Sequence, residues 1–561
     1  MDYRNSAQEW LEQCNDAELK EQLAALLETG TEEEIADAFF QDLSFGTAGL
    51  RGVIGPGTNR MNVYTVGRAT QGLADYINAT CTNSPARVAI ARDSRNKGKV
   101  FVKVAASVLA ANGIESYLYP RIEPVPALSF AVRDLGCFAG ICMTASHNPA
   151  SYNGYKVYGA DGCQITSEAA ASISASIANI DPFTQVKTMN FEEAEESGLI
   201  KWIGEETLDR FVNAVCQCGL ELPEAQDEAL SLVYTPLCGS GLECMQRIFD
   251  FAHIKELSLV EQQVQPDGNF PSCEYPNPEE RSALEVGLQV CKERGADLLM
   301  ATDPDADRLG IAVAHEGDYV LPTGNEVGIL LFDYLCKMHT QLGTMPSNAL
   351  AISTIVSTAM IDAIAATYGV EIRRTLTGFK YIGDIITELE RNGEEKRFIL
   401  GFEESYGYLT GAHVRDKDAI NAGLLVCQMA RYYKSQGKDL IEALNELYER
   451  YGYYVNRTVN IAFPGAEGAQ SMASIMTALH ENPPAELAGI PITEVVDYQD
   501  GVGSLPSANV VELRIAEGTK IIFRPSGTEP KMKLYLFAKA PSASEAQHLL
   551  DTLEEAARKL T

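Results

Sequence analysis

Long hydrophobic runs are absent from this chain of 561 residues. No stretch reaches the roughly 18 consecutive apolar residues that a membrane-spanning helix needs. The opening residues, MDYRNSAQEWLEQCNDAELK, lack the charged and then apolar order of a secretory signal. We therefore expect a cytoplasmic protein with no membrane partner.

Metal-binding and redox spacings of cysteine and histidine are also missing. The 13 cysteines include no Cys-x-x-Cys pair, and the 7 histidines show no zinc-ligand spacing. An odd number of cysteines without a secretory signal predicts reduced thiols rather than a disulfide framework.

Positive charge is scarce, because 45 lysines and arginines accompany 77 acidic residues and the net charge is −32. Such a chain is not expected to bind nucleic acid or an anionic membrane. It can still bind an anionic substrate, provided that a few cations gather in one place. Each Arg or Lys in a Gly-, Ser- or Thr-rich loop is therefore a candidate for phosphate binding.

Short apolar runs alternate with helical patterns over most of the chain, which favours α/β units. Three blocks of this kind predict three α/β domains of similar plan. The segment 510–540 differs, since it predicts strand, turn, strand, loop and strand, followed by a helix over 542–560. The expected domains are a helical extension at 1–40, α/β domains at 41–205, 206–322 and 323–455, and an α+β domain at 456–561.

A polar turn, TASHNP (144–149), directly follows the apolar run FAGICM. It places Ser146 beside His147, and the turn signal NG and Lys156 follow. Taken alone, this segment is either simply a turn or a turn that presents Ser146 for chemistry.

Three carboxylates alternate in ATDPDADRLG (301–310), where Asp303, Asp305 and Asp307 follow an apolar run. In a curled loop they can converge on one hard cation, and oxygen ligands suit Mg²⁺. An EF-hand is excluded, because Arg308 stands where that loop needs Gly and Ala314 where it needs Glu. The alternative is a solvated acidic turn.

A carboxylate and a hydroxyl alternate in GFEESYG (401–407), so in an extended loop Glu403 and Ser405 point the same way. That pairing suits vicinal hydroxyls of a sugar, although a Glu-Glu pair is usually just surface. Further along, Lys417 lies between two aspartates, a pattern that also fits a surface ion pair.

Two other loops carry arginine. In FRPSGTEPKMK (523–533), Arg524 can bind a phosphate through two nitrogens, while Gly527 lets backbone N–H groups approach. The hydroxyls of Ser526 and Thr528 and the charges of Lys531 and Lys533 add to this, although a proline-bounded hairpin loop is the alternative. In FGTAGLRG (45–52), Arg51 is expected in a Gly-rich turn that matches neither a Walker A nor a dinucleotide motif.

In this order, the loops resemble those of the α-D-phosphohexomutase family, in particular its longer phosphoglucomutase/phosphopentomutase branch. The similar segments are TASHNP, DPDADR, GFEESYG and RPSGTEP, with lesser matches at FGTAGLRG, YTPLCGSG (234–241), FPSCEYPNPE (270–279) and TGFKYIG (377–383). One departure is Pro304, since the family's metal loop most often reads Asp-Gly-Asp. Proline removes an N–H but no carboxylate, so metal binding should survive.

The resemblance implies three α/β domains with mixed sheets and a smaller C-terminal α+β domain around a central cleft. It implies a phosphosugar mutase that uses Mg²⁺, a phosphoserine at Ser146 and glucose 1,6-bisphosphate as activator and intermediate. The implied metal ligands are Ser146, Asp303, Asp305 and Asp307. The implied catalytic residues are Ser146, Lys417, Lys156, Arg308, His147 and Arg51. The implied substrate-binding residues are Thr377, Gly378, Glu403, Ser405, Arg524, Ser526, Gly527, Thr528 and Lys533.

Several functions remain open within and beyond this family. Its glucose-type members have Glu-Glu-Ser in the sugar loop, which favours a phosphoglucomutase over a phosphomannomutase, a phosphopentomutase or a glucose 1,6-bisphosphate synthase. A serine hydrolase would need a Gly-x-Ser-x-Gly elbow, and Ser146 lies in Ala-Ser-His instead. A catalytically dead sugar-phosphate-binding protein should have lost a serine, an aspartate or the phosphate arginine, and all are present.

Overall fold

The computed structural model describes residues 3–46, 49–82, 85–226, 228–463, 465–526 and 531–561. It divides into two compact units, which are treated separately below. Unit 1 comprises residues 1–321, 383–395 and 407–431, and unit 2 comprises 322–382, 396–406 and 432–561. Among the described helices, none combines the length and the hydropathy of a membrane-spanning segment.

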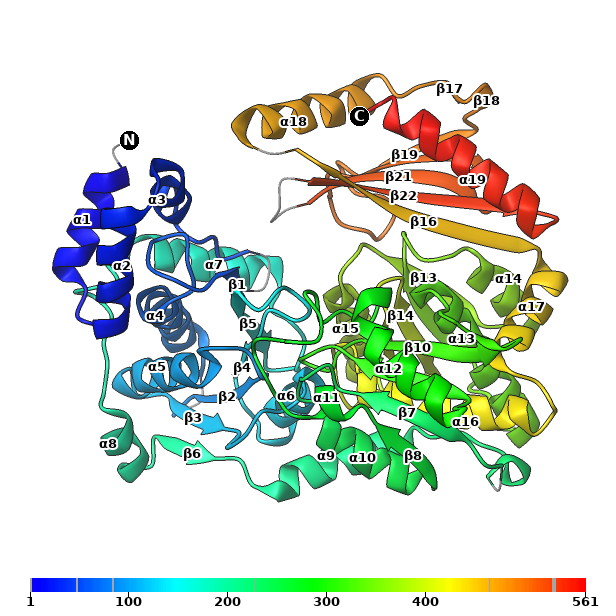
Figure 1. The fold of residues 1–561 in the computed structure, drawn as a ribbon, viewed down its shortest axis with the longest axis horizontal. Coiled ribbons are helices and arrows are strands. Elements are labelled where there is room, and N and C mark those ends of the chain that lie inside the picture. Colours follow the sequence, from blue (N-terminus) through cyan, green and yellow to red (C-terminus); the bar gives the residue numbers. More distant parts are fainter. Residues whose placement is uncertain (1–2, 47–48, 83–84, 227, 464, 527–530) are drawn as a thin grey trace. The chain divides into compact units, whose positions relative to one another are not determined.

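Unit 1 begins with a small group of helices, drawn in dark blue in Figure 1: α1 (Tyr3–Gln13), α2 (Ala17–Thr29) and α3 (Glu32–Phe39). Side chains of Asp16 and Thr31 accept hydrogen bonds from the first turns of α2 and α3, which fixes where these helices start. The helices enclose a core of their own that includes Trp10, Leu23 and Ile35. Residues 3–39 therefore form three helices around a core of their own.

The first sheet of unit 1 has the order β1-β5-β4-β2-β3-β6 and is mixed, because β1 and β5 run antiparallel to their neighbours. Its strands are β1 (Gly49–Val53), β2 (Arg87–Arg92), β3 (Glu115–Leu118), β4 (Ala139–Met143), β5 (Tyr152–Gly159) and β6 (Ile200–Trp202). Its helices are α4 (Val63–Thr80), α5 (Gly98–Ala111), α6 (Val125–Asp134), α7 (Ser167–Ala178) and α8 (Phe191–Glu196).

The central strands of this sheet are apolar on both faces, because helices cover them on both sides. Every residue of β4 is buried, and so are four consecutive residues of β2. α5 packs on β2 and β3, and α6 packs on β2 and β4. The turn that joins β4 to β5 contains Ser146, so the sheet holds both ends of this turn.

The second sheet of unit 1 follows the same plan, with the order β11-β10-β9-β7-β8. Here β7, β8 and β9 are parallel, and β10 and β11 are antiparallel to their neighbours. Its strands are β7 (Ser231–Thr235), β8 (Glu256–Leu259), β9 (Leu298–Thr302), β10 (Leu309–His315) and β11 (Asp318–Val320). Its helices are α9 (Glu205–Gln217), a short 3₁₀ turn (Pro223–Ala225), α10 (Leu242–Phe251), α11 (Glu261–Val264) and α12 (Arg281–Arg294). The turn between β9 and β10 carries the three aspartates.

Unit 2 contains a third, parallel arrangement in which β12 (Leu350–Thr354) pairs with β13 (Glu371–Thr375) and with β14 (Phe398–Glu403). Its helices include α13 (Gly324–Leu342), α14 (Met360–Tyr368) and α17 (Leu440–Tyr451). Two helices pass from one unit to the other along the chain, α15 (Phe379–Arg391) and α16 (Ala419–Lys434), with a 3₁₀ turn at Glu395–Arg397. The strand β15 (Gly407–Leu409) belongs to unit 1.

The C-terminal part of unit 2 is an antiparallel sheet with the order β16-β22-β21-β20-β19. Its elements are β16 (Tyr453–Ala462), α18 (Gly465–Glu481), β17 (Glu486–Leu487), β18 (Ile490–Pro491), β19 (Glu494–Asp497), β20 (Val511–Ala516), β21 (Thr519–Pro525), β22 (Lys531–Ala540) and α19 (Ala543–Arg558).

Successive side chains of β21 and β22 point to opposite faces of the sheet, and both faces are packed. Phe523 and Leu534 join the core under α18 and α19, whereas Ile522 and Tyr535 join a second core with Ile355 of the third sheet. The predicted fold class is confirmed: three α/β domains are followed by a smaller C-terminal domain built on a sheet and helices.

Candidate active site

The turn after β4 holds Ser146 in an unusual backbone conformation. Its φ is 52°, in the left-handed region, and its side chain is only 3% exposed. The hydroxyl of Thr144 accepts a hydrogen bond from the Ser146 N–H at 2.8 Å, which stabilises the turn. The hydroxyl of Ser146 is therefore fixed in position by the backbone as well as by its own contacts.

Arg95, which follows β2, binds the backbone of this same turn. Its guanidinium donates to the carbonyl oxygens of Ser146 at 2.7 Å, Pro149 at 2.8 Å and Tyr152 at 2.9 Å, and also to that of Asn148. A planar group with five donors suits several acceptors in one turn, which a lysine could not bind equally well.

Asp93 accompanies Arg95, and both side chains are fully buried with 3.4 Å between their charged atoms. Burial raises the pKa of Asp93 to about 6 in spite of the opposing charge of Arg95. The sequence analysis did not single out this pair. A usable signal existed, because the two residues follow a parallel strand that neighbours β4, and the carboxyl ends of such strands meet at one edge of a sheet.

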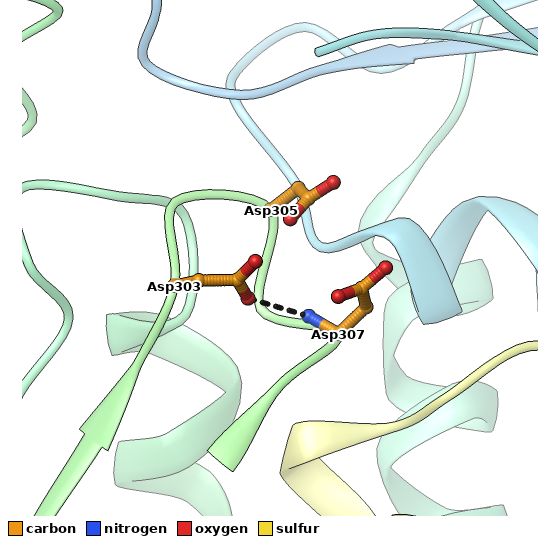
Figure 2. Close-up of side chains that lie close together, drawn as sticks. All are labelled: Asp303, Asp305 and Asp307. Atoms are coloured by element: carbon orange, nitrogen blue, oxygen red, sulfur yellow. Dashed lines mark hydrogen bonds between the residues drawn. The ribbon is translucent and has the colours of Figure 1, made fainter. Parts of the chain in front are cut away.

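The turn between β9 and β10 brings three carboxylates together, as Figure 2 shows. Asp303, Asp305 and Asp307 are buried, and their nearest oxygens lie within 4.8 Å of one another. An oxygen of Asp303 accepts hydrogen bonds from the backbone N–H groups of Asp307 at 3.1 Å and Arg308 at 3.0 Å, which curls the turn. The alternative of a solvated acidic turn is therefore wrong.

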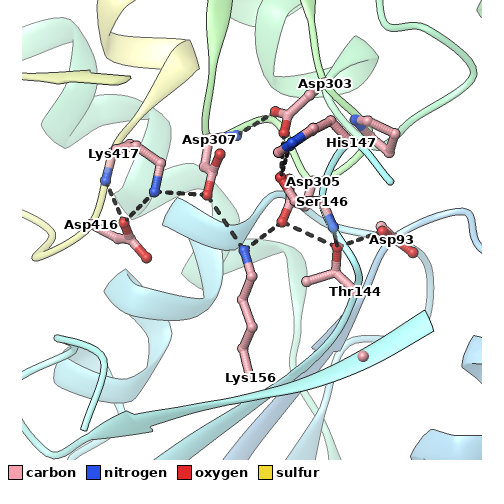
Figure 3. A network of polar contacts seen from close by, with 12 residues as sticks. Asp93, Thr144, Ser146, His147, Lys156, Asp303, Asp305, Asp307, Asp416 and Lys417 are labelled. Atoms are coloured by element: carbon pink, nitrogen blue, oxygen red, sulfur yellow. Dashed lines mark hydrogen bonds and ion pairs between the residues drawn. The ribbon is translucent and has the colours of Figure 1, made fainter. Parts of the chain in front are cut away.

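Two lysines balance part of this negative charge, as drawn in Figure 3. Lys156 lies 2.8 Å from Asp305, and Lys417 lies 3.0 Å from Asp307. Burial alone would raise the pKa of Asp307, but the charges of Lys417 and Lys156 lower it. Burial raises the pKa of Asp303 well above its ordinary range, and the charges of Asp305 and Asp307 raise it further.

This carboxylate cluster fits a divalent cation. One oxygen of Asp305 and one of Asp307 are buried and have no hydrogen-bond partner among the described residues, although a buried charged oxygen without a partner is costly. The lysines contact the other oxygen of each carboxylate. An all-oxygen donor set of this size suits Mg²⁺ and leaves room in the coordination shell for a phosphate oxygen.

Ser146 lies directly at this cluster, as Figure 3 shows. Its hydroxyl donates to Asp303 at 2.8 Å and lies 3.1 Å from Nδ1 of His147. Burial lowers the pKa of His147 well below its ordinary value, and the nearby charge of Arg308 lowers it further. The imidazole next to the serine is therefore neutral at physiological pH.

Lys417 is buried, 8% exposed, so the surface ion pair considered from the sequence is wrong. Besides Asp307, it contacts Asp416 at 2.9 Å. Tyr158 and Gln164 donate to the other oxygen of Asp416 at 3.0 and 3.1 Å. The sequence analysis did not assign a role to Asp416, because nothing in its local pattern separates it from a surface acid.

The two remaining candidate cations of unit 1 lie at the edges of this arrangement. Arg308 donates to Glu279 at 2.6 Å, a residue of the segment FPSCEYPNPE. Arg51 donates to the side chain of Asn148 at 3.2 Å. The expectation of a Gly-rich turn at Arg51 is wrong: it lies within strand β1, where it pairs with Gly154 of β5.

In unit 2, Glu403 ends strand β14 and is buried, and it accepts a hydrogen bond from the N–H of Gly378 at 2.8 Å. The hydroxyl of the neighbouring Thr377 is buried, and no described residue forms a hydrogen bond with it. The expected extended loop through Ser405 is wrong, because residues 404–406 form a turn and Tyr406 has a φ of 62°. Glu403 and Ser405 are therefore not related by simple alternation.

The phosphate-loop candidates lie at the end of the β21–β22 hairpin. Arg524 donates to the hydroxyl of Tyr535 at 3.3 Å and is the cross-strand partner of Lys533. Ser526 follows β21 and is partly exposed. The remaining two candidates, Gly527 and Thr528, lie outside the described residues.

Comparison with known proteins settles the family. Residues 42–183, 209–317 and 323–451 match alpha/beta/alpha domains I, II and III of "Phosphoglucomutase/phosphomannomutase". The chain belongs to this family, which consists of phosphosugar mutases. A phosphoglucomutase of Staphylococcus aureus is 35% identical to it over 557 residues, which cover 97% of each chain.

Solved structures of family members share the fold. Parafusin from Paramecium, a phosphoglucomutase in its open form, has a TM-score of 0.68 at 18% identity and covers 92% of this chain and 94% of its own. A family protein from Burkholderia thailandensis has a TM-score of 0.67 at 19% identity, with coverage of 92% and 97%. At these identities the similarity concerns the fold alone.

Proposed function

We propose that this phosphosugar mutase interconverts α-glucose 1-phosphate and glucose 6-phosphate through a phosphoserine at Ser146. The observation that carries the proposal is the 2.8 Å contact between the Ser146 hydroxyl and Asp303, inside a buried cluster of three carboxylates and two lysines. The similarity to the S. aureus phosphoglucomutase supports glucose as the sugar.

Mg²⁺ is the cation that this cluster suits, held by Asp303, Asp305 and Asp307 together with an oxygen on Ser146. When bound, it supplies a Lewis acid that withdraws charge from a phosphate. The chain's own contribution is to keep three oxygen ligands close together and to exclude water from them, since all three aspartates are buried. The orphaned oxygens of Asp305 and Asp307 support this assignment.

The reaction then proceeds in two transfers of opposite direction. Phospho-Ser146 gives its phosphoryl group to the free hydroxyl of a glucose monophosphate, and the serine hydroxyl is regenerated. The resulting glucose 1,6-bisphosphate turns over and returns its other phosphate to Ser146. A glucose 1,6-bisphosphate molecule is also what first loads the serine, which makes it an activator.

Proton transfer is needed in each half, because a neutral serine or sugar hydroxyl is a poor nucleophile. Lys417 and Lys156 are the candidates for this role, and His147 lies close enough to the Ser146 hydroxyl to hold it in position. Opposing carboxylates raise the pKa of Lys156 even though burial lowers it. A raised pKa makes Lys156 a poor proton donor, so its main effect is to neutralise negative charge.

Unit 2 supplies the candidates for substrate recognition. We assign Glu403 and Ser405 to the sugar hydroxyls, and Arg524, Ser526, Gly527, Thr528 and Lys533 to the phosphate that does not react. Thr377 and Gly378 join the sugar-binding group, because the Gly378 N–H fixes the Glu403 carboxylate. In unit 1, we assign Arg51 and Arg308 as supporting cations.

A substrate panel tests the proposal. The purified protein is assayed with Mg²⁺ and trace glucose 1,6-bisphosphate on glucose 1-phosphate, mannose 1-phosphate and ribose 1-phosphate. We expect the highest kcat/KM for glucose 1-phosphate. A preference for ribose or mannose 1-phosphate would contradict the choice of sugar, and inactivity on all three would contradict the mutase assignment itself.

A further inference from the structure

A second nucleophilic arrangement lies in unit 1, away from Ser146. Cys218 follows helix α9, and its sulfur lies 3.8 Å from Nδ1 of His413. The other ring nitrogen of His413 lies 2.9 Å from a carboxylate oxygen of Asp418. A carboxylate on one side of an imidazole and a thiol on the other is the order that activates cysteine nucleophiles.

The electrostatics of this cysteine, histidine and aspartate favour a charged imidazole. The side chain of His413 is 6% exposed, and burial alone would lower its pKa, but Cys218 and Asp418 raise it to about 9. A positively charged neighbour stabilises a thiolate, the form of cysteine that attacks electrophiles. Cys218 is partly exposed.

The backbone near the Cys218 sulfur leaves no room for a side chain at position 411. Gly411 has a φ of 74°, and a Cβ placed there would come within 2.7 Å of the Cys218 sulfur and 3.4 Å of Nδ1 of His413. A side chain at position 411 would therefore separate the thiol from the imidazole. The carbonyl oxygens of Ala214 and Thr410 also lie near the sulfur, at 3.4 and 3.6 Å.

We propose that Cys218 is a redox modification site, which hydroperoxides oxidise to a sulfenic acid and thereby slow the mutase. The sulfur attacks one peroxide oxygen, an S–O bond forms and the O–O bond breaks. The leaving oxygen accepts the electron pair and takes the proton from His413, so the products are the sulfenic acid and water or an alcohol. A low-molecular-weight thiol reverses the change by forming a mixed disulfide, which a second thiol reduces.

The connection to catalysis runs through a short segment of chain. Asp418 also accepts hydrogen bonds from the N–H groups of Ile420 at 2.9 Å and Asn421 at 3.0 Å, and thereby begins helix α16. Its neighbour in sequence is Lys417, which contacts Asp307. A Cβ at position 411 would already come within 2.7 Å of the sulfur, so we expect an oxygen added to the sulfur to displace this segment, and with it the lysine. The loss of activity rests on the proposed function, whereas the oxidation itself does not.

The first test measures the chemistry alone. The full-length protein is treated with hydrogen peroxide, and sulfenic acids are trapped with dimedone and located by peptide mass spectrometry. Cys81 is the control, because it is also partly exposed. We expect Cys218 to be labelled at least about tenfold faster, because His413 and Asp418 stand beside its sulfur in the order that assists proton removal from a nucleophile. Equal or slower labelling would overturn the proposal.

Two variants extend this test. His413→Asn, checked for folding by its thermal melt, should reduce the labelling rate of Cys218 to that of Cys81. An unchanged rate would overturn the role of the imidazole. Cys218→Ser should keep full basal activity and resist peroxide, while Cys81→Ser should lose activity in peroxide as fast as the parent. Inactivation of Cys218→Ser at the parent rate would overturn the regulatory effect. A parent without basal mutase activity would refute the proposed function, and the labelling result would stand independently of it.

Discussion

The candidate residues of the two units differ in how deeply they are buried. In unit 1, Ser146 and the three aspartates are between 0 and 3% exposed, and each contacts another member of the cluster or a lysine. In unit 2, Ser405, Arg524 and Ser526 are partly exposed. Burying charge in the absence of a ligand is costly, so chains do it where chemistry requires fixed groups.

This difference separates two kinds of contribution to catalysis. Groups that are fixed and dehydrated in advance act mainly on the transition state, so their loss should lower kcat. Groups that become dehydrated when substrate binds discriminate between substrates, so their loss should raise KM and change specificity. Four substitutions test this contrast.

The largest effect is expected from Ser146→Ala. Without the hydroxyl no phosphoryl group can be stored, so mutase activity should fall by several orders of magnitude while the fold is retained. Steady-state kinetics measure the mutase activity, and a thermal melt shows whether the fold is retained. Ser151→Ala, an exposed serine of the same connection between β4 and β5, should keep parental activity. Substantial activity in Ser146→Ala would remove the serine from the mechanism.

The second largest effect is expected on the dependence of activity on Mg²⁺. Asp305→Asn should raise the Mg²⁺ concentration for half-maximal activity at least about tenfold, because even residues that only orient metal ligands contribute about 10- to 100-fold to affinity. Chelation with EDTA should abolish the parent's activity, and added Mg²⁺ should restore it. The exposed Asp318 offers the control Asp318→Asn. Saturation of Asp305→Asn at the parental Mg²⁺ level would place the cation elsewhere.

A smaller effect should follow from Arg95→Lys, which keeps the charge but cannot bind four carbonyl oxygens at once. We expect a loss of about 1–3 kcal/mol in the free energy of unfolding, the cost of leaving buried acceptors unpaired. We also expect kcat to fall while KM for glucose 1-phosphate stays constant. Arg87→Lys, at an exposed position of the same strand β2, is the control. A higher KM with unchanged kcat would contradict a role confined to positioning Ser146.

The smallest effect on kcat is expected from Glu403→Gln in unit 2, because this carboxylate, although buried, is assigned to a sugar hydroxyl and not to the reacting phosphate. A lost hydrogen bond from a sugar hydroxyl to a charged group costs about 1.5–3 kcal/mol, which corresponds to roughly 10- to 150-fold in kcat/KM. The change should appear mostly in KM and should narrow the preference for glucose over mannose 1-phosphate. Glu404→Gln is the neighbouring control. If Glu403→Gln reduced kcat as strongly as Asp305→Asn does, the contrast between the units would fail.

Much of the fold could be predicted from the sequence because its signals are local. The apolar runs around Val88, Ile141 and Leu299 are strands in the structure, since each is buried on both faces. The convergence of the three aspartates could be predicted as well, because residues that alternate within one short turn cannot lie far apart.

What could not be predicted depends on contacts between distant residues. Arg95 and Asp416 contact segments far away in sequence, and their local patterns resemble ordinary surface charge. The extended loop at Ser405 was a wrong prediction, because a left-handed residue at Tyr406 reverses the chain there. Arg51 was misplaced for a related reason: pairing with β5 draws a glycine-rich segment into a strand.

The central claim is that Ser146 carries the phosphoryl group between two positions of glucose. The most direct measurement loads the protein with glucose 1,6-bisphosphate, removes the free sugar, maps the phosphate by peptide mass spectrometry and then adds glucose 1-phosphate. The account predicts a single phosphate on Ser146 that leaves the protein on addition of glucose 1-phosphate, with glucose 1,6-bisphosphate as the product. A phosphate on another residue, or one that remains on the protein, would contradict it.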